Sequence, residues 1–402
     1  MTTGNGSGPL AMVGLFSGIG GLELGLARAG HEARLLCEND ASALAVLTHR
    51  FPQARIHRDV RTLRTLPRGT ELLAAGFPCQ DLSQAGRSAG ILGRKSGIIA
   101  EVFRLLRGTR TPWLLLENVP FMLHVKKGKA FRLLIEELER LGYAWVYRVV
   151  DSRAFGLPQR RERVFLLASR VADPRSYLLS QDAGPPPQPT PGKAFGFYWS
   201  EGNKGLGWAV NAIPALKRGS ALGIATPPAV ILPDGRIVKP DIRDAERLQG
   251  FPVNWTISAK AEFDGRTTRR WGLVGNAVTV RVAEWIGRRL LQLRTYDDED
   301  DELLLPGDAW PRAAWSWDGR RGSADVSTWP VRRHQTAVHE FLRFPGELLS
   351  ERAAAGFLGR IRASTLRLPE GLETALTRHL EELRSNGASN HAKTGPRRKA
   401  RT

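Results

Sequence analysis

The stretch AMVGLFSGIGGLELGLARAG, Ala11 to Gly30, carries the pattern that decides the fold. Residues 11–16 form a short apolar run that predicts a strand, and residues 21–30 have the spacing of a helix. The glycine-rich turn Gly18–Gly21 lies between them. Glycines at the start of a helix let a ligand approach the backbone amides. The stretch therefore predicts a strand, a ligand-binding turn and a helix.

The same alternation continues to about residue 170. Further apolar runs predict strands at 33–39, 71–77, 112–119 and 163–169, and amphipathic segments predict helices at 41–51, 101–108 and 131–142. Strands that alternate with helices form a mainly parallel sheet covered on both faces. The predicted fold class is α/β, with ligands bound at the carboxyl ends of the strands.

Composition excludes several classes of protein. The 402 residues are 42% hydrophobic and 25% charged, which is ordinary for a soluble globular protein. Two cysteines cannot form a disulfide framework, and a cytosolic thiol fits better. The N-terminus has no signal-peptide pattern, and no apolar run approaches the length of a membrane span. The net charge of +19 favours a polyanionic partner, most plausibly nucleic acid, although solvated arginines would give the same count.

Changes in composition predict the domain boundaries. Pro, Gly and aromatic residues after 170 predict loops and short strands of a smaller irregular domain, because a flexible linker would hold fewer aromatics. Helices are expected again at 241–251 and 274–293. The predicted segments are a disordered N-terminus (1–9), a first domain (10–170), an irregular domain (171–265), a return to the first domain (266–295), a mostly helical C-terminal extension (296–385) and a basic disordered tail (386–402).

The extension begins at the acidic run DDEDDE, Asp297 to Glu302, which is interpreted as a solvated boundary. Two helices are expected beyond it. One of them is defined by leucines on a single helical face, with Gly387 as its expected end. These leucines are Leu372, Leu376, Leu380 and Leu383. The two helices are expected to pack on the first domain rather than to touch nucleic acid.

Acidic side chains follow the first predicted strands. Glu38 ends the strand at 33–39, where a carboxylate can accept both hydroxyls of a ribose, and Asp59 follows another candidate strand. Position 23 is Glu, so the G-x-G-x-x-G pattern of dinucleotide-binding folds is incomplete. These features alone indicate only a cofactor that contains a nucleoside.

Cys79 lies just past the strand at 71–77, after Pro78 and before a polar segment. Cysteine is often a small buried hydrophobe, and Cys37, inside its strand, fits that description. Cys79 does not, because Pro78 ends the strand at the edge where substrate is expected. A nucleophilic thiolate is therefore predicted at Cys79.

Two further elements bring charge to the same edge of the sheet. Glu117 follows three leucines, and partial desolvation would raise its pKa and suit a proton donor, whereas a solvated strand end would leave it an ordinary carboxylate. In GLPQRRERVFLL, a strand places Gln159, Arg161 and Arg163 on one face. Two guanidiniums there can bind an anion or a base carbonyl, and the alternative is a charged edge strand.

Together these elements resemble the bacterial cytosine-5 DNA methyltransferases. The resemblance runs in order through most of residues 12–290. It is carried by FSGIGG (Phe16–Gly21), Glu38, Asp59-Val60, GFPCQ (Gly76–Gln80), ENV (Glu117–Val119), QRRER (Gln159–Arg163), RLQGFP (Arg247–Pro252) and GNAV (Gly275–Val278). Many members carry Asp where this chain has Gly14, and an apolar or aromatic residue where it has Asn39. Residues 296–402 lie outside the resemblance.

The resemblance implies a Rossmann-like catalytic domain, a target-recognition domain at 171–265 and S-adenosylmethionine as methyl donor, with no metal. It implies that Cys79 attacks carbon 6 of a cytosine flipped out of a specific duplex DNA sequence. Glu117 would protonate ring nitrogen 3 or hydrogen-bond to it, and Arg163 with Arg161 would bind the base carbonyl. The implied cofactor-binding residues are Phe16, Gly18, Ile19, Gly21, Glu38, Asp59, Pro78, Ile98, Asn276 and Val278.

The resemblance also bears on partners. The glycine-rich segment 81–97 resembles the mobile catalytic loop of the family, and Lys204, Lys217 and Arg218 are candidates for phosphate contacts. A monomer on DNA is expected, in the bacterial cytoplasm with the nucleoid. A restriction endonuclease encoded separately is a possible partner.

Three alternatives stay open at this point. A tRNA cytosine-5 methyltransferase would use the same scaffold, although the long segment 171–265 favours DNA. A catalytically silent DNA-binding protein would not need Cys79, Glu117 and Arg163 together. A dinucleotide oxidoreductase would explain Glu38 and would leave the other motifs unexplained.

Overall fold

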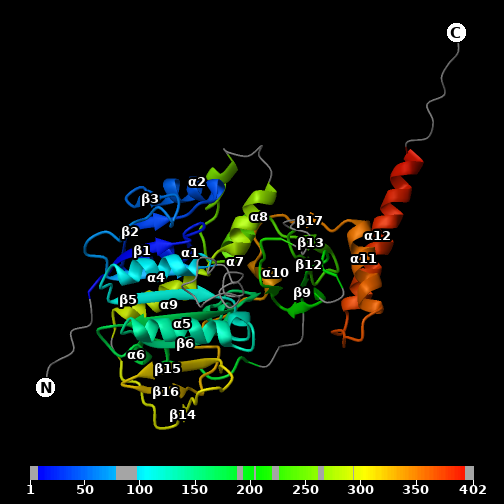
Figure 1. Ribbon diagram of the computed structural model, residues 1–402. Helices are drawn as coiled ribbons and strands as arrows, with labels where there is room; N and C mark the ends of the chain where they lie inside the picture. Colours follow the sequence, from blue (N-terminus) through cyan, green and yellow to red (C-terminus); the bar gives the residue numbers. More distant parts are fainter. Residues whose placement is uncertain are drawn as a thin grey trace.

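The computed structural model describes residues 8–77, 97–187, 193–202, 205–219, 226–260, 267–292 and 294–393. Within these ranges, ten strands form one large sheet in the order β14-β16-β15-β6-β8-β5-β4-β1-β2-β3 (Figure 1). The strands are β1 (Ala11–Leu15), β2 (Glu32–Cys37), β3 (Arg55–His57), β4 (Leu72–Gly76), β5 (Trp113–Asn118), β6 (Ala144–Asp151), β8 (Glu162–Ser169), β14 (Glu302–Leu303), β15 (Ala313–Trp317) and β16 (Arg320–Ser323).

The neighbouring strands β3, β2, β1, β4 and β5 are all parallel. β8 runs antiparallel to both β5 and β6, so β6 points the same way as β5. The prediction of an α/β fold with a mainly parallel sheet is therefore confirmed. None of the described helices is long and apolar enough to cross a membrane.

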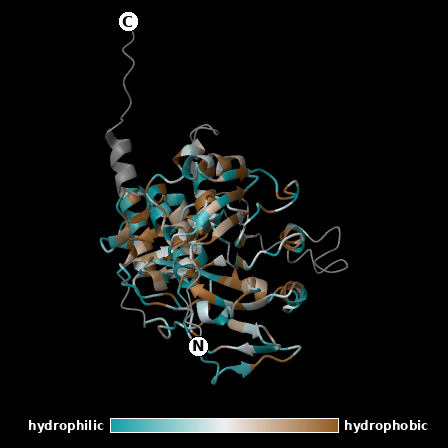
Figure 2. Ribbon diagram, turned by 90° about the vertical axis from the view of Figure 1, so that its left-hand side faces the viewer, coloured by the Kyte–Doolittle hydropathy of each residue, from teal (hydrophilic) through white to brown (hydrophobic). Residues whose placement is uncertain are grey.

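Helices cover both faces of the sheet, which explains why central strands such as β4 are continuously apolar. In β4, Leu73 and Ala75 pack in the core that includes α4 and α5, whereas Leu72 and Ala74 pack in the core that includes α1 and α9. Hydrophobic residues accordingly gather along the central strands, and hydrophilic ones along the peripheral loops (Figure 2). The helices around the sheet are α1 (Gly21–Arg28), α2 (Ala41–Arg50), α4 (Ile99–Arg107), η1 (Pro120–Leu123), α5 (Lys129–Arg140), η2 (Ser152–Phe155), α6 (Arg175–Leu178) and α9 (Val280–Leu290).

A second sheet, antiparallel throughout, lies beside the first in the order β10-β9-β12-β13-β17. Its strands are β9 (Phe195–Phe197), β10 (Trp208–Val210), β12 (Ala229–Ile231), β13 (Ile237–Lys239) and β17 (Glu347–Leu348). The short strands β7 (Gln159–Arg160) and β11 (Ile213–Pro214) pair in parallel and join the two parts of the molecule. Short strands in the segment after residue 170 were predicted, but the last strand of this sheet comes from the C-terminal extension.

The extension is not mostly helical, so that prediction is wrong for residues 296–330. β15 pairs with β6, and β14 and β16 continue the large sheet beyond it. The turn of the β15–β16 hairpin is Asp318–Gly319, both with positive φ, and Asp-Gly is a strong hairpin signal. Trp310, Trp315 and Trp329 are buried, and they pack in the cores on either face of the large sheet.

The acidic run is also more than a solvated boundary. Asp298 forms an ion pair with Arg175 at 2.7 Å, and Asp301 accepts hydrogen bonds from the Tyr296 hydroxyl. The ion pair holds the start of the extension against α6, and the hydrogen bonds of Asp301 close a turn within the extension. Disorder is predicted for residues 1–9 and 386–402, of which 1–7 and 394–402 lie outside the described residues. The prediction is wrong for residues 386–393, which are helical.

The expected helices appear only in the second half of the extension, as α10 (Val338–Phe341), α11 (Glu351–Arg362) and α12 (Leu372–Lys393). Leu372, Leu376 and Leu380 are buried on one face of α12, as predicted, but the helix continues past Gly387. α11 and α12 cover the second sheet rather than the first domain (Figure 1), and Phe357 of α11 stacks on Phe197 with ring centroids 4.3 Å apart. Their packing partner was therefore predicted wrongly.

Three helical segments connect the two parts of the molecule: α7 (Ile242–Leu248), η4 (Ile257–Lys260) and α8 (Thr267–Asn276). The predicted helix at 274–293 is broken, because α8 ends at Asn276 and α9 starts only at Val280. The amide of Val280 donates to the Gln249 carbonyl, and the Thr279 hydroxyl donates to the Gln249 side chain. The chain turns between the two helices to make these bonds.

A buried polar network fixes this junction. The Gln159 side chain accepts a hydrogen bond from the Leu216 amide at 2.8 Å and donates to the Leu248 carbonyl at 2.9 Å. The Gln249 side chain donates to the Val274 carbonyl at 2.9 Å. The Arg161 guanidinium donates to the carbonyls of Leu216, Gly275 and Ala277. Four segments far apart in the sequence therefore meet at the Gln159–Gln249–Arg161 network.

Gln159→Leu should destabilise the protein by at least about 2 kcal/mol, because the Leu216 amide and the Leu248 carbonyl would stay buried without partners. Chemical denaturation followed by tryptophan fluorescence measures the loss. The control is Arg160→Ala at the exposed neighbouring position, which should change stability by less than about 0.5 kcal/mol. Equal effects of the two changes would contradict the role of the network.

Phe357→Ala should cost about 3 to 5 kcal/mol in the same measurement, because it removes a fully buried ring stacked on Phe197. Leu366→Ala, at a side chain that is 44% exposed, is the control and should be nearly neutral. A neutral result for Phe357→Ala would mean that α11 does not contribute to the core of the second sheet.

Candidate active site

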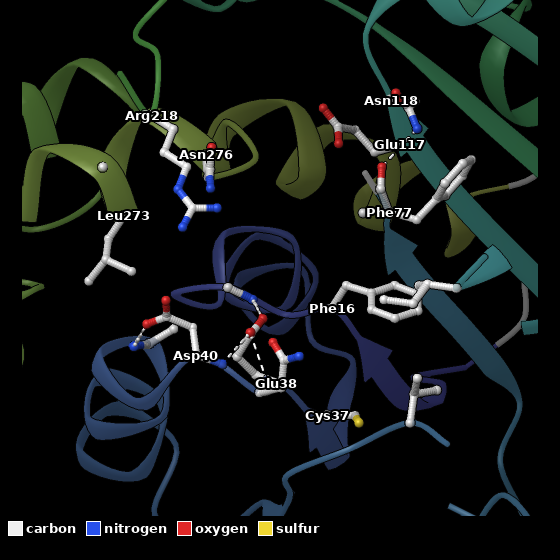
Figure 3. Close-up of a pocket in the computed structure, with 18 of the residues that line it drawn as sticks. Phe16, Cys37, Glu38, Asp40, Phe77, Glu117, Asn118, Arg218, Leu273 and Asn276 are labelled. Carbon is white, nitrogen blue, oxygen red and sulfur yellow. Dashed lines mark hydrogen bonds between the residues drawn. The ribbon is translucent and has the colours of Figure 1, made fainter. Parts of the chain in front are cut away.

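A cavity of about 740 Å³ opens at the carboxyl ends of β1, β2, β4 and β5, the edge at which ligand binding is expected. Its lining comes from the β1–α1 turn, the ends of β2, β4 and β5, the start of β8, and α8. Figure 3 shows Glu38 and Asp40 at one end, Glu117 at the other, and Phe16 between them. Arg218 and Asn276 lie across from Glu38.

The carboxylate of Glu38 is held in place by backbone amides. One oxygen accepts from the Gly18 amide at 2.8 Å, and the other accepts from the Asn39 and Asp40 amides at 2.8 and 2.9 Å. A carboxylate has about four lone-pair sites, so Glu38 can still accept from a ligand hydroxyl. The side chain is therefore oriented before any ligand arrives.

The turn after β1 is strained where it meets the cavity. Phe16 has φ 56°, a left-handed conformation that a bulky residue rarely adopts, and Gly18 has φ 55°. Both residues line the cavity, and a Cβ added to Gly18 would meet no atom within 4 Å. Gly18 is therefore required by its backbone conformation rather than by crowding. Strain of this kind is typical of a ligand-binding loop.

Glu117 and Arg163 form an ion pair at the other end of the cavity. The Arg163 Nε lies 3.2 Å from a Glu117 oxygen, and its NH1 donates to the Glu162 carbonyl. Burial raises the pKa of Glu117, and the nearby guanidiniums of Arg163 and Arg161 oppose this shift only in part. We expect the desolvation effect to dominate, because Glu117 is only 8% exposed. The raised pKa makes the protonated form of Glu117 more accessible than it is for an exposed carboxyl group.

Asn118 fixes the chain that leads to the predicted nucleophile. Its side-chain amide donates to the Phe77 carbonyl at 2.8 Å, and its side-chain oxygen accepts from the Val119 amide. Gly76 is paired with Glu117 across β4 and β5. Pro78 and Cys79 lie outside the described residues, as does 81–96. The described chain thus enters the Cys79 segment directly beside Glu117.

Arg161, which is predicted to bind the base carbonyl together with Arg163, also belongs to the buried network. Its two terminal nitrogens are used by the buried network, and burial lowers the pKa of the guanidinium well below its usual range. Only its Nε is buried without a hydrogen-bond partner among the described residues. Arg161 lines the cavity, but it mainly connects β8 to the loop before α9.

Most of the predicted cofactor residues line the cavity: Phe16, Gly18, Glu38, Asp59, Ile98 and Asn276. Ile19, Gly21 and Val278 lie behind the lining. Ile19 is a core residue, and its carbonyl accepts from the Trp255 indole. A Cβ on Gly21 would lie 2.3 Å from the Val278 carbonyl oxygen, so Gly21 lets α1 approach the loop before α9. These three residues shape the site through packing.

The sequence did not point to several charged residues of the cavity. Arg58, Arg61, Arg218 and Arg269 line it near Glu38, and Arg269 pairs with Asp40. Arg218 had been considered only as a phosphate contact. A Cβ on Gly275 would lie 2.1 Å from the Lys217 carbonyl oxygen, so Gly275 brings Arg218 against α8. That close approach follows from the tertiary packing and leaves no local signal.

Lys217 and Lys204 are two of the residues predicted as candidates for phosphate contacts, and the structure describes only Lys217. Lys217 forms an ion pair with Glu201 at 3.1 Å and lies over the Tyr198 ring, so its charge is already partly compensated. Lys204 lies outside the described residues.

Cys37 lines the cavity, but burial raises the pKa of its thiol to about 12. It is therefore no nucleophile at neutral pH, which agrees with its interpretation as a core residue.

Comparison with known proteins gives the same assignment as these motifs. Residues 10–202 match the model of the family described as C-5 cytosine-specific DNA methylase. The chain is 48% identical over 369 residues to Type II methyltransferase M2.BsuMI of Bacillus subtilis (strain 168), and the match covers 89% of this chain and 94% of the relative. It is also 35% identical over 180 residues to Type II methyltransferase M.BanI of Aneurinibacillus aneurinilyticus, with 42% of this chain and 41% of the relative covered.

Among solved structures, the Dnmt2 methyltransferase of S. pombe is similar with a TM-score of 0.50 and 17% sequence identity. The match covers 70% of this chain and 98% of that chain, and at this identity it shows the fold alone. The relative from Bacillus subtilis matches along nearly its whole length at 48% identity, and the family model matches residues 10–202, which hold the motifs from FSGIGG to QRRER. The chain belongs to the C-5 cytosine-specific DNA methylase family.

Proposed function

We propose that this protein transfers a methyl group from S-adenosylmethionine to carbon 5 of a cytosine that is flipped out of duplex DNA, through a covalent bond to Cys79. The observation that supports this most is the single cavity that joins the preoriented Glu38 to the Glu117–Arg163 pair. A nucleoside-containing donor and a base would meet in such a cavity. Family membership supports the same reaction.

The residues present fit the methyl donor. Glu38 would accept the ribose hydroxyls, because its carboxylate is fixed and retains acceptor capacity. Phe16 would lie against the donor between the two ends of the cavity, and Asp59, Ile98 and Asn276 would complete the lining. When bound, S-adenosylmethionine supplies an activated methyl group on a sulfonium.

The chain's own groups would activate the base. The Cys79 thiolate would add to carbon 6, while Glu117 delivers its proton to nitrogen 3 as charge develops there. Arg163 would hold Glu117 at 3.2 Å and bind the base carbonyl. After methylation, carbon 5 would lose its proton to a base, the bond between sulfur and carbon 6 would break to release Cys79 as a thiolate, and nitrogen 3 would return its proton to Glu117. Cys79, Glu117 and Arg163 together would make carbon 5 of the cytosine nucleophilic enough to accept the methyl group.

Duplex DNA is the proposed substrate, and the rim of the cavity fits it. Phe121, directly beyond the cavity residue Val119, is 65% exposed. Residues 118–135 contain no Asp or Glu, and they include the exposed Lys126, Lys127 and Lys129. Such a surface suits a phosphate backbone. The named relatives are Type II methyltransferases, so we place the protein in a Type II restriction–modification system, with its endonuclease encoded separately.

Glu117→Gln should lower the single-turnover rate of methylation by about 100-fold or more, because an amide hydrogen-bonds but delivers no proton. Affinity for S-adenosylhomocysteine should change little. Glu162→Gln is the matched control, since Glu162 precedes Arg163 in the sequence but its side chain forms a surface ion pair with Arg312. A Glu117 variant with the wild-type rate would remove proton transfer from the role of Glu117.

Duplex DNA with 5-fluorocytosine at the target should form a denaturation-resistant complex in the presence of S-adenosylmethionine. Fluorine cannot leave as a cation, so Cys79 would stay attached after methylation. Cys79→Ser should form no complex, whereas Cys37→Ser should form it like the wild type, because a thiol with a pKa of about 12 takes no part. An adduct mapped to another residue, or formed only with tRNA, would refute the proposal.

A further inference from the structure

Gly14 is the position in β1 at which many members of the family carry Asp, and its surroundings explain why an acid is missing there. A Cβ added to Gly14 would lie 2.1 Å from a carboxylate oxygen of Glu23 and 2.8 Å from the Ser17 hydroxyl. The space that a side chain at position 14 would fill is thus occupied by the Glu23 carboxyl group. Glu23 reaches this space from the first turn of α1.

Glu23 is the kind of buried group that needs an explanation. It is 1% exposed, and its second oxygen has no hydrogen-bond partner among the described residues. The hydroxyl of Ser17 beside it is also buried without a hydrogen bond in the described structure. A buried carboxyl group without a full set of partners is costly, so such groups are often completed by an ion or a ligand.

The position of Glu23 connects it to the cavity. Ser17, which adjoins Glu23, lies between Phe16 and Gly18, and both of these residues line the cavity. The Gly18 amide in turn donates to Glu38. Glu23 therefore lies beneath the strained turn that would face the methyl donor. Glu38, which does line the cavity, is also close enough to Glu23 for the two negative charges to repel each other.

We propose that Glu23 is a positioning residue of the methyl-donor site, which supplies from α1 the carboxylate that position 14 does not supply from β1. It supports the Phe16–Gly18 turn and gives it negative charge for the cationic sulfonium end of the donor. The inference rests on the proposed function, because only that function calls for a cationic ligand here. Glu23 itself does not line the cavity, so it would act on the donor through the Phe16–Gly18 turn.

Binding of a cation should then release a proton from Glu23. Burial, and to a lesser degree Glu38, raise the pKa of Glu23 to about 7, so the group is about half protonated at neutral pH. A cationic ligand favours the ionised form and lowers that pKa. Affinity should therefore rise with pH through about 7 and level off above it. Glu117 also has a raised pKa and, with Glu38, Asp40 and Asp59, shares the cavity, so its part must be measured separately.

Isothermal titration calorimetry with S-adenosylmethionine, without DNA and in two buffers of different ionisation enthalpy, measures the release. Wild type should release about half a proton at pH 7. Glu23→Gln should release about half a proton less than the wild type at pH 7. It should bind S-adenosylmethionine about tenfold more weakly at pH 8, and its affinity should no longer rise with pH. Glu117→Gln should keep the release. Ionisation of the ligand's own amino group is common to all variants and cancels in the comparison.

A relocated carboxylate separates this role from simple packing. Gly14→Asp alone should weaken binding, because its side chain collides with Glu23. Gly14→Asp combined with Glu23→Ser should recover most of the affinity, whereas Gly14→Asn with Glu23→Ser, of the same shape, should not. Equal recovery by the Asn and Asp pairs, or unchanged proton release in Glu23→Gln, would overturn the inference and leave the proposed function intact. Wild type that binds no S-adenosylmethionine would overturn both.

Discussion

The Gln159–Gln249–Arg161 network is the interaction on which the arrangement of this molecule depends. It is buried, and it ties together the entry to β8, the strand β11 region, the end of α7 and the turn between α8 and α9. Because buried amide and guanidinium groups are costly when unpaired, the four segments can hardly separate without leaving several of them unsatisfied. The network therefore sets where α8, and with it one wall of the cavity, stands relative to the parallel strands.

This division of roles changes how the motifs of the chain are understood. In QRRER, Arg163 forms an ion pair with Glu117, whereas Gln159 and Arg161 hold the buried network together. In RLQGFP, Gln249 belongs to the network, and in GNAV, Gly275 makes room for the Lys217 backbone. Within a few residues of one motif, some side chains face the cavity and others hold the fold together. A motif that looks catalytic in sequence thus serves, in large part, to bring distant segments together around the cavity.

The parallel half of the fold could be predicted because its signals are local. Each strand from β1 to β5 that was predicted is a continuous apolar run, and Glu38 and Glu117 directly follow such runs. Ile19, Gly21 and Val278 were predicted to surround the cofactor and do not line the cavity, because a resemblance gives neighbours of a ligand without saying which of them face it. The role of Arg218 and the proximity of Glu23 to Gly14 depend on packing between segments far apart in sequence. The hairpin at Asp318–Gly319 did have a local signal, and the expectation of a helical extension obscured it.

The second sheet is built from two stretches of chain that are more than a hundred residues apart. β9 to β13 come from residues 195–239, but β17 pairs with β13, and α11 and α12 supply much of the core beneath the sheet. The sheet and its core are therefore encoded by two separate parts of the gene. If the sheet reads DNA sequence, neither piece can be exchanged between relatives alone without exposing apolar surface on the other. New specificities in this lineage would then arise from point substitutions on a fixed frame, or from recombination that carries the whole C-terminal part of the chain.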